Sequence, residues 1–79
     1  MIERRAAPRN RVMMAGTIEF EGSTITCLVR DLSISGAALD VTSSGRIPEH
    51  FTLVFQADGV HMPCRIIWCK EERIGVAFG

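Results

Sequence analysis

The sequence predicts an all-β fold, a small six-stranded antiparallel β-barrel with a flexible N-terminal arginine arm. Short segments with strand patterns recur along the chain, turn residues separate them, and no segment shows sustained helical periodicity. We expect the sheet to close into a barrel, because open sheet edges invite aggregation. The 79 residues leave room for one domain, made of an arm over residues 1–11 and a barrel over residues 12–79.

The predicted strands can be justified in order. In the first, Ile18 and Phe20 alternate with polar neighbours, which is the period of a half-buried strand. The second is rich in β-branched residues, which favour extended backbone. A loop with room for one helical turn separates the third strand from the fourth. The six predicted strands span residues 12–20, 24–32, 37–41, 51–55, 60–69 and 74–78.

Turn residues mark the boundaries between these strands. Gly22 and the Asp58–Gly59 pair suit tight hairpins, because glycine adopts positive φ without a steric penalty. Pro63 falls inside the fifth predicted strand, where it has no N–H to donate to a neighbour. We therefore expect Pro63 at an edge position or at a bulge.

Charge is distributed unevenly along a chain whose formal net charge is zero. The zero total argues against general adhesion to nucleic acid or membrane. Residues 1–11 nevertheless hold four arginines against Glu3 alone, whereas the remainder is mildly acidic. This asymmetry is consistent with an anionic ligand and equally with a solvated charged tail.

The three cysteines are an odd number without CxxC spacing, so they predict neither a disulfide framework nor a zinc site. Buried free thiols in a reducing cytoplasm are the simplest interpretation. We expect cytoplasmic localisation and no membrane insertion, because the N-terminus lacks the apolar stretch of a signal peptide and no apolar run is long enough to span a bilayer. No catalytic constellation is present, so we expect no enzymatic activity, no metal and no cofactor.

Two arginines four positions apart, Arg5 and Arg9, lie in a segment without strand or helix pattern. Pro8 stiffens the backbone between them. A guanidinium group can bind phosphate in a bidentate manner, stack on a base, or read guanine O6 and N7. One side-chain type therefore suits every part of a guanine nucleotide.

A second segment, Asp31-Leu32-Ser33-Ile34-Ser35-Gly36, follows the second predicted strand. A carboxylate can accept hydrogen bonds from guanine N1–H and N2–H, and a serine hydroxyl can donate or accept. Gly36 would permit positive φ or a close approach of ligand to backbone. Taken alone, the hexapeptide is more simply a bulge or turn held by local side-chain hydrogen bonds.

The ordered pair of these segments, RxxxR and then DxSxxG, resembles the signature of the PilZ family. The flanks are similar as well, with Gly-Ala-Ala-Leu over residues 36–39, Ile-Ile-Trp over 66–68 and Gly-Val-Ala-Phe over 75–78. The resemblance covers essentially the whole chain. It implies a six-stranded barrel that binds cyclic di-GMP on its outer surface. One departure is Ser35, which stands where many relatives have a second glycine.

The resemblance also implies residue roles. Arg5 and Arg9 would clamp guanine and phosphates, and Asp31 and Ser33 would read a base, with Gly36 allowing the turn. In the family, the position of Arg4 bears on whether one or two stacked ligands are held, and an arginine there could stack on a second guanine. The implied ligand site therefore consists of Arg4, Arg5, Arg9, Asp31, Ser33 and Gly36.

Other polar and aromatic residues have simpler interpretations. His50 and His61 show no metal-ligand spacing, so we expect them at the surface. Trp68 lies among apolar neighbours, which favours packing in the core or barrel wall over stacking on a base. Arg11 could contact phosphate or begin a solvated strand, and Arg30 could pair with Asp31 or add positive potential there.

Three functions remain as hypotheses. The first is a receptor whose arm orders on cyclic di-GMP and relays the signal to a downstream effector protein. The second is a PilZ-like module that binds a protein and no nucleotide. The third, a barrel that binds RNA or single-stranded DNA, is opposed by the neutral charge and the scarcity of aromatic residues, so we expect no nucleic acid polymer as partner. We expect a monomer or a weak homodimer.

Overall fold

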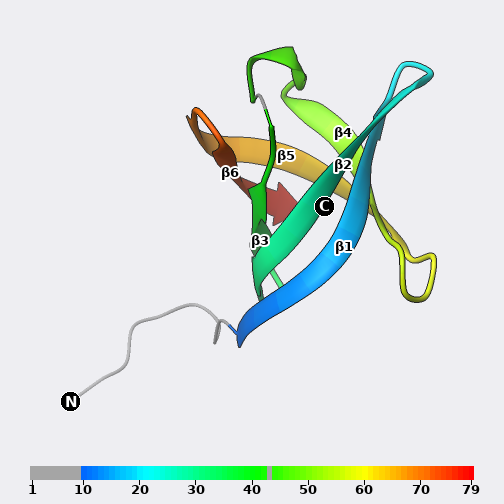
Figure 1. Cartoon of the computed structure of the whole chain (residues 1–79), viewed down its shortest axis with the longest axis vertical. Helices are drawn as coiled ribbons and strands as arrows, with labels where there is room; N and C mark the ends of the chain where they lie inside the picture. Colours follow the sequence, from blue (N-terminus) through cyan, green and yellow to red (C-terminus); the bar gives the residue numbers. More distant parts are fainter. Residues whose placement is uncertain (1–9, 43) are drawn as a thin grey trace.

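The computed structural model describes residues 10–42 and 44–79, and over these ranges the six strands form a closed antiparallel barrel (Figure 1). The order around the barrel is β1-β2-β3-β6-β5-β4, and β4 closes the sheet by pairing with β1. The strands are β1 (Asn10–Phe20), β2 (Ser23–Leu32), β3 (Gly36–Asp40), β4 (His50–Phe55), β5 (His61–Lys70) and β6 (Arg73–Phe78), with one 3₁₀-helix, η1 (Ser44–Arg46). The predicted all-β barrel is confirmed, and so is the single helical turn before the fourth strand.

The start of the barrel lies slightly earlier than expected. β1 begins at Asn10, so Asn10 and Arg11 belong to the first strand. The predicted arm residues Arg4, Arg5 and Arg9 lie outside the described residues. Within the described ranges, no helix has the length and apolar character needed to cross a bilayer.

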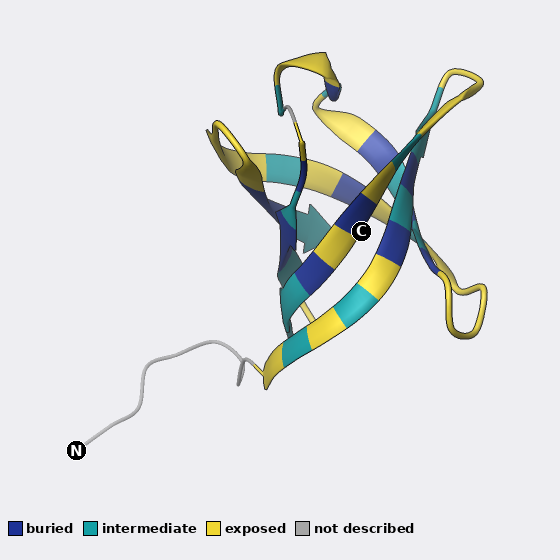
Figure 2. Ribbon diagram, in the orientation of Figure 1, coloured by how far each residue is buried: buried dark blue, intermediate teal, exposed yellow. Residues whose placement is uncertain are grey.

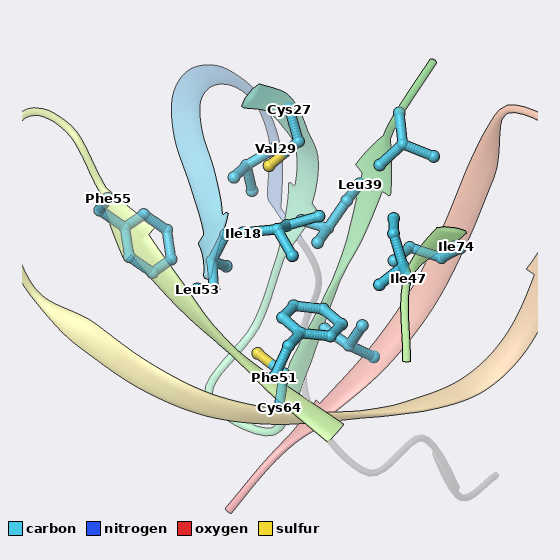
Figure 3. Close-up of a cluster of buried hydrophobic side chains, with 12 residues drawn as sticks. Ile18, Cys27, Val29, Leu39, Ile47, Phe51, Leu53, Phe55, Cys64 and Ile74 are labelled. Carbon is cyan, nitrogen blue, oxygen red and sulfur yellow. The ribbon is translucent and has the colours of Figure 1, made fainter. Parts of the chain in front are cut away.

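The core is built from directly opposed residues on the inner face of the sheet. Val29, Leu39 and Ile74 form one such row across β2, β3 and β6, and Ile18 opposes Leu53 between β1 and β4. All five side chains have no solvent exposure. Burying each contributes roughly 1.5–3 kcal/mol. Buried and exposed residues alternate along the ribbons in Figure 2, and the inner side chains converge in Figure 3.

Pro63 lies neither on an edge strand nor at a bulge, contrary to the expectation, because β5 pairs with β4 on one side and with β6 on the other in a closed barrel. It opposes Thr52 of β4, whereas the pairing of β5 with β6 ends at Cys64 and Phe78. The Pro63 carbonyl accepts a hydrogen bond from the Gly79 N–H at 2.9 Å. The missing proline N–H therefore lies just beyond the last pair of the β5–β6 ladder, so it removes no hydrogen bond from that ladder.

The bulge in β5 lies instead between Ile66 and Trp68. In a regular strand Trp68 would point inward like Ile66, but the extra residue Ile67 shifts the alternation. Trp68 now opposes Gly75 of β6, and its side chain is 41% exposed. Packing in the core or on the barrel wall was expected for Trp68, and the structure places the ring on the barrel wall.

All three cysteines are free thiols, and two of them are buried as expected. Cys27 and Cys64 lie in the core (Figure 3). Burial raises the pKa of each thiol to about 11, which keeps both protonated at neutral pH. Cys69 is exposed, contrary to the expectation.

Candidate functional site

One row of opposed residues crosses five strands on the outer face of the barrel. Arg11, Asp31, Ala38, Gly75 and Trp68 follow one another across β1, β2, β3, β6 and β5. Directly opposed residues project from the same face of a sheet, and the neighbouring row of Val29, Leu39 and Ile74 fills the interior. The outer row therefore has an acidic group on one side, an indole on the other and the smallest side chains between them.

A pocket of about 260 Å³ lies over this row. Most of its lining is apolar, with a few polar groups from the end of β2 and the following loop, a composition typical of small-molecule sites. Such sites usually exceed ~300 Å³, so this pocket suits one ring system better than a whole dinucleotide. Its lining comprises Asp31, Leu32, Ser33, Ser35, Gly36, Ala37, Ala38, Ile67, Trp68, Gly75, Val76 and Ala77.

Gly75 leaves the space that the Trp68 ring occupies. A Cβ atom at position 75 would collide with the indole, so the ring rests directly on the glycine backbone. The Lys70 ammonium lies 5.6 Å from the centroid of the Trp68 ring, within reach of a cation–π interaction. The indole is thereby positioned as one wall of the pocket.

Ser33 holds the loop between β2 and β3 in shape. Its Oγ accepts hydrogen bonds from the N–H groups of Ser35 and Gly36, each at 3.2 Å. Its own N–H donates to the Gly36 carbonyl at 2.9 Å. The local-turn interpretation of the hexapeptide is therefore confirmed for Ser33, and a bulge between Val29 and Asp31 precedes the turn.

Gly36 does not adopt the positive φ that was one of the two roles expected of it. Its φ lies outside the positive region that Gly22 and Gly59 occupy. A Cβ atom on Gly36 would collide with the Val76 carbonyl of β6. The glycine therefore allows β3 and β6 to approach each other beneath the loop, and the proposed turn-forming role is corrected.

An ionic network lies on the outer face beside Asp31. Arg30 of β2 and Arg73 of β6 both donate to Asp40 of β3, at 2.9 Å and 2.6 Å. The hydrogen bond from Arg73 has the largest effect and lowers the Asp40 pKa below its ordinary value. Desolvation opposes this, and the hydrogen bond from Arg30 lowers the pKa further. Two roles were considered for Arg30, an ion pair with Asp31 or added positive potential beside it, and the structure shows an ion pair with Asp40.

The structure brings together the three predicted site residues that it describes. Asp31, Ser33 and Gly36 all line the pocket. Arg4, Arg5 and Arg9 belong to the part of the chain that is not described. Trp68 also lines the pocket, which its apolar neighbours in the sequence did not indicate, although Trp68 and Gly75 both belong to the flanks that resemble the family. His50 and His61 are exposed, as predicted.

Comparison with protein families decides the assignment. The family model described as PilZ domain matches residues 3–79. The chain belongs to the PilZ domain family. PilZ domains are in general modules that bind cyclic di-GMP or interact with effectors, and they are not enzymes. Comparison with curated proteins finds no significant match. Over residues 10–42 and 44–79, no group of three or more His, Cys, Asp or Glu side chains is placed to hold a metal ion.

Proposed function

We propose that this PilZ domain binds cyclic di-GMP, with one guanine in the pocket between Asp31 and Trp68. The observation that carries the proposal is the outer row, in which a carboxylate and an indole flank the small residues Ala38 and Gly75. The Asp31 carboxylate would accept from guanine N1–H and N2–H. The exposed Trp68 ring offers a surface for stacking, an interaction worth about 1–3 kcal/mol per base.

The rest of the ligand would lie outside this pocket. Arg5 and Arg9 supply guanidinium groups for phosphates and for the second guanine, and Arg4 adds a further stacking surface. Support for these roles comes from the family motif and from arginine chemistry. Ordering of this arm on the ligand would change the surface that a downstream effector protein reads. Ser33 serves the site chiefly by holding its loop.

Isothermal titration calorimetry with cyclic di-GMP tests the proposal. We expect saturable binding by the parent protein and none of cyclic di-AMP, since adenine lacks the N1–H and N2–H donors. Asp31→Asn should weaken binding at least about tenfold, because the amide replaces one oxygen acceptor with a donor facing the guanine donors.

Asp58→Asn is the matched control, since Asp58 lies in the exposed turn between β4 and β5 and makes the same charge change. It should bind like the parent. Absence of binding by the parent at micromolar concentrations would overturn the proposed function. Equal affinities of parent and Asp31→Asn would overturn the site.

A second candidate function is protein recognition without nucleotide. It is favoured by a shallow apolar groove that adjoins the same loop, where Ile34 is 89% exposed. Contiguous exposed apolar side chains often mark protein contacts. Co-purification of a stoichiometric partner, independent of cyclic di-GMP and lost in Ile34→Asp, would favour this function. The groove is lined by Met14, Leu32, Ser33, Ile34, Phe55, Asp58, Val60, Met62 and Phe78.

A further inference from the structure

A second hollow of about 210 Å³ adjoins the guanine pocket and shares Asp31 with it. Its other lining residues are Arg11, Val12, Arg30 and Arg73, and we call it the arginine hollow. Three strands contribute guanidinium groups, since Arg11 lies on β1, Arg30 on β2 and Arg73 on β6. Residues far apart in the sequence thus converge beside the proposed base-reading carboxylate.

Positive charge is in excess in the arginine hollow. Its three guanidinium groups face the carboxylates of Asp31 and Asp40, which leaves one net positive charge. Asp40 lies at the border of the hollow, where it is bound to both Arg30 and Arg73. An anion entering here would meet more positive than negative charge even while Asp31 is ionised.

The two ion pairs also orient the arginines, and each uses only one nitrogen of its guanidinium group. Arg30 contacts Asp40 through Nη1 and Arg73 through Nε. A guanidinium group carries five N–H donors in a planar fork that matches the oxygens of a phosphate. Since Asp40 lies between the two side chains, it holds both forks on the same patch of surface.

We infer that the arginine hollow binds a phosphate group of the ligand whose guanine occupies the neighbouring pocket. The inference rests on the proposed function and extends it to residues outside the two sequence motifs. A phosphodiester is attached to every guanosine of cyclic di-GMP, so a base seated beside Asp31 places a negative charge within reach of this surface. Exposed ion pairs stabilise a fold little, so a structural role explains the three clustered arginines less well.

Calorimetry with cyclic di-GMP on four variants tests the inference. Arg30→Gln and Arg73→Gln should each weaken binding about three- to tenfold, as expected for one charge-assisted contact at an exposed site. Both variants should also reduce the dependence of affinity on salt concentration. Arg46→Gln is the control, since Arg46 is an exposed arginine on η1 that does not line the hollow.

Asp40→Asn separates phosphate binding from a structural role. It retains both guanidinium charges and removes a negative charge beside the phosphate. This gain in net positive charge should offset the loss of the carboxylate that orients the two arginines, so the inference predicts binding as tight as the parent's or tighter. If the arginines act only by bracing the strands through Asp40, Asp40→Asn should weaken binding as much as Arg30→Gln, and this result would overturn the inference. Thermal unfolding of each variant verifies that the fold is retained.

The two proposals can fail separately. If the parent binds cyclic di-GMP and the Arg30 and Arg73 variants bind equally tightly, the inference is overturned and the proposed function stands. If the parent does not bind cyclic di-GMP, the proposed function is overturned. Titration with inorganic phosphate then tests whether the arginine hollow binds a phosphate group by itself. Phosphate should shift the arginine Nε–H NMR signals of the parent, and these shifts should be smaller in Arg30→Gln and Arg73→Gln. That result would support phosphate binding in the hollow, and a parent spectrum that phosphate does not change would overturn it.

Discussion

At the scale of single residues, side-chain size governs this site as much as polarity. Gly36 and Gly75 both stand where a Cβ atom would meet another group, namely the Val76 carbonyl and the Trp68 ring. Both glycines also line the pocket. Substitution of either glycine would therefore change the shape of the pocket and leave its polar side chains unchanged.

Gly75→Ala should displace the Trp68 indole from the barrel wall. The ring can swing outward, so we expect a moderate loss of about 1–3 kcal/mol in the free energy of unfolding. Emission of Trp68, the single tryptophan, should shift to longer wavelength as exposure rises, and affinity for cyclic di-GMP should fall. Fluorescence and chemical denaturation measure these effects.

The matched control for this substitution is Gly45→Ala. A Cβ atom at position 45 would meet nothing within 4 Å, so emission and affinity should remain those of the parent. An unchanged spectrum in Gly75→Ala would show that the glycine does not support the indole.

At the scale of strands, bulges decide which side chains share the outer face. The bulge between Ile66 and Trp68 turns the indole outward, and that between Val29 and Asp31 leaves Arg30 free of the β2–β3 register. The side chain of Arg30 then reaches Asp40, which Arg73 also binds. Three strands, β2, β3 and β6, are thus connected by one carboxylate.

This connection predicts a pH dependence of stability. The Asp40 pKa is lowered in the folded protein from a reference value of 3.8, so its ion pairs stabilise the fold above that value and are lost as pH falls through the folded pKa. In urea denaturation, Asp40→Asn should be less stable than the parent at pH 6, and the difference should shrink below about pH 4. Since the carboxylate is partly exposed, the difference should be small and should decrease with salt.

If the difference in free energy of unfolding between the parent and Asp40→Asn stayed the same below about pH 4, the stabilisation could not be assigned to the ion pairs. Asp58→Asn serves as the control for removing a carboxylate, because the Asp58 side chain accepts only a local hydrogen bond, from the Val60 N–H.

The strands and one half of the site could be predicted from the sequence, because both depend on local patterns. Alternation and turn residues place most strand ends within one or two positions, and Asp31, Ser33 and Gly36 lie in one continuous segment. The opposition of Asp31 to Ala38, and of Gly75 to Trp68, depends on register and bulges between strands. Local patterns do not specify that register, so the Trp68 wall could not be predicted from its own neighbours.

At the scale of the whole molecule, the residues that stabilise the barrel and those of the proposed ligand site lie on opposite faces of the sheet. The inner rows form a continuous apolar core, and the outer row of β2, β3, β6 and β5 carries the proposed guanine pocket. Ligand binding on the outer wall would therefore leave the core packing unchanged. The energetic effect of the ligand would fall on surface loops and side chains, where a partner protein could detect it.

The central claim, a guanine between Asp31 and Trp68, is tested most directly by tryptophan fluorescence during titration with cyclic di-GMP. Trp68 is the sole tryptophan, so its emission reports on this pocket alone. We predict saturable quenching as the base stacks on the indole, with a midpoint that rises at least about tenfold in Asp31→Asn. Unchanged emission while calorimetry detects binding would place the ligand elsewhere and contradict the claim.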